Sequence, residues 1–374
     1  MFLIMDLSLN RKSLSKSIRI IAAVSFITAC AYIFLSGREK GKSVVPDYKN
    51  RSGTAIIMTG AAARIPQEAA LLEELYNRGE LDDVVFISGV SSGALNAVML
   101  NGILSGKITW KEYRDILFNL NDSDIFIQSE KKKLPVNTSP ERMLFKRIVE
   151  DKLGYYTIGD LPYITEISVT DLKALDLKKK VFRLCSRKIN EESDTTLSLV
   201  DIMMATSAFP LAFPPERIAN VKTIPDVEYS DGGLGDDHVP FHALLEFEKF
   251  RNQGVEKVYI ISRKNDSIPE ISEELKSFGI DDKGRFDRIG VSIDNILMKG
   301  IIRRLVAFES EAPELVSRSY IFIPGFEERF LLFNFSNLKE QYILTYDWAR
   351  KNNPVPLNDF LSVYRTRIKK ESVK

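Results

Sequence analysis

The chain has 374 residues, of which 44% are hydrophobic and 28% are charged, and its net charge at pH 7 is +1. This length and composition are typical of a folded globular protein with one large core or two modest ones. The near-zero net charge and the lack of a basic stripe argue against nucleic-acid binding. The two cysteines, Cys30 and Cys185, are too few for a disulfide framework or a zinc site.

Residues 20–37 form an 18-residue run without a charged side chain, after a basic N-terminal tail over residues 1–19. As a helix this run would span roughly 27 Å, close to the hydrocarbon thickness of a bilayer. We therefore expect a single-pass membrane anchor. A cleaved signal segment of a secreted protein is one alternative. The sequence Ile27-Thr28-Ala29-Cys30 leaves another, a lipoprotein attached at Cys30.

A charged linker over residues 38–53 leads into the folded domain, which we expect to cover residues 54–352 and to end in a C-terminal tail, 353–374. Two buried strands, 54–58 and 83–88, are each followed by an apolar helical pattern. This alternation predicts an α/β fold with a mainly parallel sheet covered on both faces. Further strands are predicted at 164–170, 181–185, 255–262 and 319–323. The polar stretch 121–140 is expected to be a mobile surface loop.

The second helix, predicted over 92–104, begins directly after the turn Gly89-Val90-Ser91-Ser92-Gly93. A strand, a Gly-x-Ser-x-Gly turn and a helix are the setting in which a serine hydroxyl is exposed as a nucleophile. Gly89 and Gly93 would leave room for the tight turn, and the N-terminus of the helix favours developing negative charge. Ser91 is therefore the candidate nucleophile, although any glycine-rich loop can contain this pattern.

A serine nucleophile needs a base, and the chain has two histidines, His238 and His242. A triad of Ser91, Asp231 and His238 would place the acid and the base on one short segment, which makes its geometry awkward. The other possible base is a carboxylate, and the best candidate is Asp231, which precedes Gly232 and Gly233. An Asp before two glycines is commonly only a turn, so on that feature alone Asp231 would be structural.

Four segments in order along residues 54–350 resemble the patatin-like acyl hydrolase family. This resemblance implies a three-layer fold with a mainly parallel central sheet, and a Ser91–Asp231 dyad that works without histidine, metal or cofactor. The segments are the nucleophile block 89–97, the stretch 205–215, the motif Asp231-Gly232-Gly233 and the segment 332–336.

Members of this family usually carry a Gly-Gly-Gly-x-Arg/Lys-Gly loop whose backbone N–H groups form the oxyanion hole. The matching stretch here is Gly60-Ala61-Ala62-Ala63-Arg64-Ile65. The resemblance assigns the oxyanion hole to the N–H groups of Gly60, Ala61 and Ala62, aided by Arg64. An alanine at a position that needs a positive φ would cost of order 1 kcal/mol. A second departure is that residues 236–240, Asp-Asp-His-Val-Pro, replace the usual Asn-x-Pro.

These features imply a membrane-anchored serine acyl hydrolase that cleaves lipid carboxyl esters, either phospholipid or lysophospholipid. Phe209, Leu211 and Phe213 either line the acyl channel or belong to the core. The expected partners are the lipid ester substrate and a membrane. Two alternatives remain, a non-catalytic patatin-shaped lipid-binding or scaffold protein and an acyltransferase that uses the same dyad.

Overall fold

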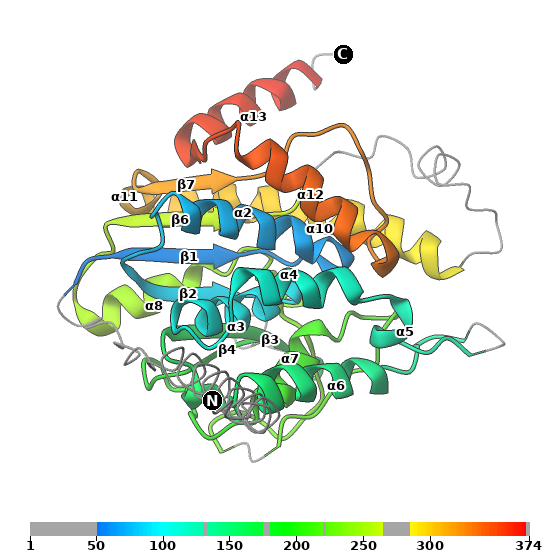
Figure 1. The fold of residues 1–374 in the computed structure, drawn as a ribbon. Coiled ribbons are helices and arrows are strands. Elements are labelled where there is room, and N and C mark those ends of the chain that lie inside the picture. Colours follow the sequence, from blue (N-terminus) through cyan, green and yellow to red (C-terminus); the bar gives the residue numbers. More distant parts are fainter. Residues whose placement is uncertain (1–50, 130–132, 175–179, 220–221, 265–284, 372–374) are drawn as a thin grey trace, which may run out of the picture. The chain divides into compact units, whose positions relative to one another are not determined.

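The structure is a computed structural model that describes residues 51–129, 133–174, 180–219, 222–264 and 285–371 (Figure 1). The chain divides into two units, Met1–Val44 and Val45–Lys374, and every described residue belongs to the second. The predicted anchor over 20–37 and Cys30 lie outside the described residues. Among the helices of the described part, none has the length and apolar character needed to cross a membrane.

One mixed sheet of eight strands organises the described part of the chain, in the order β4-β3-β2-β1-β6-β7-β8 with β5 beside β3. The inner pairs are parallel, whereas β4, β5 and β8 are antiparallel to their neighbours, so the prediction of a mainly parallel sheet is confirmed. The strands are β1 (Thr54–Met58), β2 (Val84–Gly89), β3 (Ile164–Asp171), β4 (Val181–Cys185), β5 (Tyr229–Asp231), β6 (Lys257–Ile261), β7 (Ser319–Phe322) and β8 (Val355–Pro356).

Helices cover both faces of this sheet, because its central strands are apolar on both sides. In β1, Ile56 and Met58 belong to the core of one face, whereas Ala55 and Ile57 belong to the core of the other. The first face is covered by α2 (Ile65–Asn77), α3 (Ser92–Leu104), α4 (Trp110–Asn119), α6 (Ser139–Phe145), α7 (Leu199–Ser207) and α12 (Leu338–Ala349). The second face is covered by α8 (Phe241–Arg251), α10 (Arg285–Glu311), α11 (Pro313–Val316) and α13 (Leu357–Glu371) (Figure 1).

Short helical segments complete the connections between these elements. They are η1 (Ala62–Arg64), α5 (Asp122–Ile125), η2 (Lys146–Lys152), η3 (Ile158–Asp160), η5 (Gly232–Gly235) and η6 (Phe335–Asn337).

Two expectations differ from the structure. The stretch 121–140 is not simply a surface loop, because it contains α5, a bridge between Ile127 and Asn137, and the start of α6. The folded domain also extends past residue 352. There β8 pairs with β7, and α13 buries Leu357 and Leu361 against the second face of the sheet. Burial of these leucines explains why the segment 353–374 is not only a tail.

Candidate active site

Ser91 lies in the turn between β2 and α3, with φ 57° and ψ −134°. A non-glycine residue with these angles is strained by of order 1–3 kcal/mol, so the surrounding structure must hold it there. Two contacts do so. The Ser91 N–H donates to the Thr206 hydroxyl at 2.9 Å, and that hydroxyl donates to the Ser168 carbonyl at 2.8 Å. The first turn of α3 follows, with the Ala94 N–H bonded to the Ser91 carbonyl at 2.9 Å.

The two glycines of this turn are required by close approach of the backbone. A Cβ on Gly89 would lie 2.5 Å from the Gly93 carbonyl oxygen. A Cβ on Gly93 would collide with the Thr59 carbonyl of the loop after β1. The turn therefore packs against both its own helix and the neighbouring loop, as the Gly-x-Ser-x-Gly pattern predicts.

Strand β5 brings Asp231 to the same place from more than a hundred residues away. Strand β4 occupies one edge of β3, while β2 pairs with the other edge as far as Gly89, opposite Ile167. The β5 strand continues along that second edge, with Asp231 opposite Val169. Asp231, the last residue of β5, therefore lies close to the point where β2 separates from β3, beside the turn that carries Ser91.

The Asp231 carboxylate is buried, with 3% of the residue exposed, and it lines the same cavity as Ser91. Its Oδ1 atom accepts from the Gly233 N–H at 2.8 Å. Burial raises the pKa of Asp231 to about 6, although the Ser91 hydroxyl and the Gly233 N–H favour the charged form and lower it. A carboxylate with this pKa is ionised at neutral pH and can still accept a proton.

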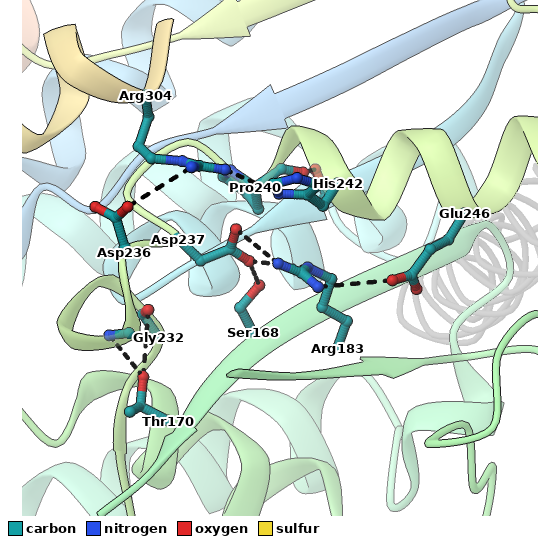
Figure 2. Close-up of polar contacts among 12 residues, drawn as sticks. Ser168, Thr170, Arg183, Gly232, Asp236, Asp237, Pro240, His242, Glu246 and Arg304 are labelled. Carbon is teal, nitrogen blue, oxygen red and sulfur yellow. Dashed lines mark hydrogen bonds and ion pairs between the residues drawn. The ribbon is translucent and has the colours of Figure 1, made fainter. Parts of the chain in front are cut away.

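The turn after Asp231 is held in place from β3 and β4, as Figure 2 shows. The Thr170 hydroxyl donates to the Asp231 carbonyl at 2.9 Å and contacts the Gly232 carbonyl. The buried Asp237 accepts from Ser168 at 2.5 Å and pairs with Arg183 through two contacts of 3.2 Å. Burial would raise the pKa of Asp237, but the Arg183 guanidinium and the Ser168 hydroxyl outweigh it and hold that pKa below its usual value.

His238 lines the same cavity as Ser91 and Asp231. Its ring packs against glycine backbone, since a Cβ at Gly300 would collide with it. Burial lowers the pKa of His238 to about 4, so the imidazole is neutral at physiological pH. The pKa of Asp231 is affected by the Ser91 hydroxyl and not by His238, which favours the carboxylate as base over the triad considered from the sequence.

The loop after β1 presents two free backbone donors next to Ser91. Within the described structure, the N–H groups of Gly60 and Ala62 make no hydrogen bond, and both residues line the cavity that contains Ser91 and Asp231. The Ala61 N–H instead donates to the Ser92 hydroxyl at 2.9 Å. Of the three N–H groups expected for the oxyanion hole, two are therefore available. Ala62 has φ 44°, so one of the alanines does occupy a left-handed conformation.

Arg64 does not line the cavity that contains Ser91. Its guanidinium pairs with Asp294 at 3.0 and 2.5 Å and donates to the Phe330 carbonyl. That Arg64 aids the oxyanion hole stays a prediction.

Two cavities meet at Ser91, Ala62 and Phe209. The first has a volume of about 20 Å³, contains the Ser91–Asp231 pair and is bounded by Leu297 and Ile301 of α10. The second, about 60 Å³, is mainly apolar and includes Phe209 and Phe213 in its wall. Leu211, expected to line the same channel, is instead 73% exposed in a turn with φ 68°.

The apolar cavity contains one acidic side chain, Glu141 of α6. Burial raises the pKa of Glu141 to about 8, and the side chain is hydrogen-bonded to Ser207. A neutral carboxyl group is compatible with an apolar ligand. In the part of the chain that the structure describes, no group of three or more His, Cys, Asp or Glu side chains could hold a metal ion.

Sequence reasoning missed the residues that support these groups. Thr206 lies inside the segment 205–215 that was noted for its family resemblance, but its contact with the Ser91 N–H could not be read from it. Arg263 follows the apolar strand β6, and its Nε donates to the Gly60 carbonyl at 3.2 Å. A charged residue at the carboxyl end of a parallel strand is the available signal, because such strand ends form the ligand-binding edge of α/β sheets.

The chain is similar to proteins of a known family. The patatin-like phospholipase family matches residues 55–245 of the chain. No curated protein matches the sequence. Among solved structures, VipD from Legionella pneumophila is similar with a TM-score of 0.32 and 12% identity, over 80% of this chain and 67% of that one.

Proposed function

The chain belongs to the patatin-like phospholipase family, a family of lipid acyl hydrolases, and we propose that it cleaves phospholipid or lysophospholipid carboxyl esters through a Ser91–Asp231 dyad. The observation that carries this proposal is that Ser91 and the buried Asp231 line one small cavity. Two residues with free backbone N–H groups, Gly60 and Ala62, line the same cavity.

The proposed reaction has two steps. The Ser91 Oγ attacks the ester carbonyl carbon while Asp231 accepts the hydroxyl proton. The N–H groups of Gly60 and Ala62 donate to the oxyanion of the tetrahedral intermediate. Collapse of the intermediate expels the alcohol, which takes the proton from Asp231 and leaves an acyl-enzyme. A water molecule, deprotonated by Asp231, then attacks the carbonyl carbon of the acyl-enzyme. Collapse of this second tetrahedral intermediate releases the fatty acid and the Ser91 Oγ, which takes the proton back from Asp231.

The apolar cavity next to Ser91 is the proposed acyl site. Its wall is formed by aromatic and aliphatic side chains, and such a wall suits a hydrocarbon chain. Phe209 and Phe213 contribute to it, and Phe333 packs against both rings at centroid distances of 6.0 and 5.7 Å.

We also propose that residues 20–37 anchor the enzyme to a membrane. The supporting observation is the uncharged apolar run in the sequence, followed by a linker with five basic and two acidic residues over 38–53. An anchor would keep the catalytic domain close to a lipid substrate.

The test compares the full chain with its Ser91→Ala variant on a short-chain ester and on phospholipid vesicles. Ser105→Ala is the matched control, because Ser105 lies at the other end of α3 and bonds only to local groups and Tyr155. We expect Ser91→Ala to lose several orders of magnitude in kcat and Ser105→Ala to keep it. Equal hydrolysis by the Ser91→Ala variant would eliminate Ser91 as the nucleophile.

A second candidate function is a lipid-binding protein without catalysis. It is favoured by the left-handed backbone conformation of Ala62 in the loop that would form the oxyanion hole. A fluorophosphonate probe separates the two functions. Covalent labelling of the unmodified chain but not of Ser91→Ala supports the hydrolase, and no labelling of either supports the binding protein. Transfer of the acyl group to an added alcohol would identify an acyltransferase, which uses the same acyl-enzyme.

A further inference from the structure

Three buried charged side chains from distant parts of the sequence meet behind the loop Gly60–Arg64. They are Arg64 at the end of the loop, Arg263 after β6, and Asp294 on α10. Their side chains are 11%, 0% and 4% exposed, respectively. Arg263 pairs with Asp294 at 2.9 Å, and Arg64 pairs with the same carboxylate at 3.0 and 2.5 Å. One carboxylate is therefore shared by two guanidinium groups, and these three side chains together carry one excess positive charge.

Among the described residues, the acid next to Arg263 does not remove that excess. Glu68 lies close to Arg263, but burial raises the pKa of Glu68 to about 8, so its carboxyl is largely neutral at pH 7. Its hydrogen bonds go to Thr59 and Asn96. A buried, net positive cluster next to a site where an oxyanion forms stabilises that oxyanion more strongly than the same charge would in water.

The cluster also holds the peptide between the two free donors. The carbonyl of Gly60 accepts from Arg263 Nε at 3.2 Å, and the N–H of the same Gly60–Ala61 peptide donates to Ser92 at 2.9 Å. Both ends of this peptide are thereby fixed. This peptide lies between the peptides that carry the free N–H groups of Gly60 and Ala62, so its position limits where those groups can lie.

Asp294 links this loop to the helix that closes the catalytic cavity. On α10, Asp294, Leu297 and Ile301 recur at spacings of three and four residues and so lie on one face. Leu297 and Ile301 line the cavity around Ser91 and Asp231. The face of α10 that covers the cavity therefore also supplies the carboxylate shared by both arginines.

From this arrangement we propose that Asp294 is a positioning residue, which aims the Gly60 and Ala62 N–H groups at the oxyanion by holding Arg263 and Arg64 together. This inference rests on the proposed hydrolase function. Without the carboxylate, two buried guanidinium groups would face each other unpaired, and their repulsion would displace the loop. A displaced oxyanion donor lowers kcat by about 10²–10³-fold.

The test uses Asp294→Asn and Arg263→Lys in the full chain, with hydrolysis of a soluble short-chain ester as the readout. Asparagine keeps the size of the side chain but removes its charge. Lysine keeps the charge but lacks Nε. We expect kcat to fall about 10²-fold in both variants while KM changes little, because the oxyanion forms only in the transition state.

Glu73→Gln is the matched control for loss of a buried ion pair. Glu73 is similarly buried and pairs with Arg114 and Tyr342, away from the loop. We expect Glu73→Gln to lower the thermal midpoint but to keep kcat, whereas a merely structural Asp294 would behave in the same way as Glu73. Unchanged kcat in folded Asp294→Asn, with Ser91→Ala inactive, would overturn the positioning role and leave the dyad intact.

A second readout does not depend on activity. Amide hydrogen exchange of a peptide covering residues 59–64 should speed up in Asp294→Asn and stay as it was in Glu73→Gln. Equal protection in all forms would overturn the inference even if the unmodified chain hydrolyses no tested ester. The proposed function is tested separately: equal ester hydrolysis by Ser91→Ala and by the unmodified chain would count against it.

Discussion

Replacing Asp231 by asparagine is expected to stabilise the fold while it abolishes hydrolysis. Burial raises the pKa of Asp231 from 3.8 to about 6. A shift of about 2 pH units corresponds to about 3 kcal/mol in favour of the neutral form. Because the pKa in the folded state is the higher one, stability is fully present below pH about 4 and is lost as the pH rises through about 6. Asparagine has nearly the same shape and stays neutral throughout.

Urea denaturation followed by circular dichroism at pH 8 and pH 4 measures this difference. At pH 8 the free energy of unfolding of Asp231→Asn should exceed that of the unmodified chain by up to about 3 kcal/mol, and at pH 4 the two should be nearly equal. If Asp231→Asn raised the free energy of unfolding equally at both pH values, or lowered it at pH 8, the reasoning that the charged Asp231 destabilises the fold would be refuted.

Asp237, six residues further along the chain, is the internal control, because its pKa is shifted in the opposite direction. Its pairing with Arg183 and Ser168 keeps the pKa of Asp237 below its usual value, so the carboxylate is charged throughout this range of pH. Asp237→Asn leaves Arg183 without its buried partner and should cost about 3 kcal/mol at both pH values. A stabilised Asp237→Asn would show that the pKa directions are wrongly assigned.

Three further predictions follow from the site. The kcat/KM of the unmodified chain on a soluble ester should fall tenfold per pH unit below an apparent pKa of about 6, because protonated Asp231 cannot act as the base. A flat profile of kcat/KM down to pH 4 would exclude Asp231 as the base. Ala62→Gly should raise the free energy of unfolding by about 1 kcal/mol, because Ala62 has φ 44°. Ala61→Gly should instead lower it by up to about 1 kcal/mol, because Ala61 has φ −131°. Equal effects of the two substitutions in urea denaturation would contradict the strain argument. Deletion of residues 1–37 should depress turnover on phospholipid vesicles and leave hydrolysis of a soluble ester unchanged; equal vesicle turnover would argue against a role of the anchor in substrate access.

The long, locally patterned elements were predictable from the sequence. The helix predicted over 92–104 and the strand over 54–58 have the bounds seen in α3 and β1, because an apolar run bounded by glycine or polar residues is a local signal. Strands β5 and β8, of three and two residues, are too short to show any periodicity. Their positions depend on the neighbouring strand that offers a free edge.

The candidate site divides in the same way. Ser91 with its flanking glycines was identified from the sequence because a tight turn with close backbone contacts demands particular residues at particular spacings. Asp231 was identified through the family resemblance, because an Asp before two glycines is by itself typical of an ordinary turn. That the two side chains line one cavity depends on β5 continuing the line of β2 along β3, which is a property of the folded sheet.

By itself, the sequence determined the family motifs and the order of the main elements, since these depend on local patterns, and the family motifs pointed to the two residues of the proposed dyad. Only the tertiary structure decided that the Ser92 hydroxyl accepts a hydrogen bond from the Ala61 N–H and that Arg64 pairs with Asp294, 230 residues away. Charged residues carry no sequence pattern that names their partners. The packing of α10 against the loop after β1 selects this pair, and with it which backbone donors remain free for chemistry.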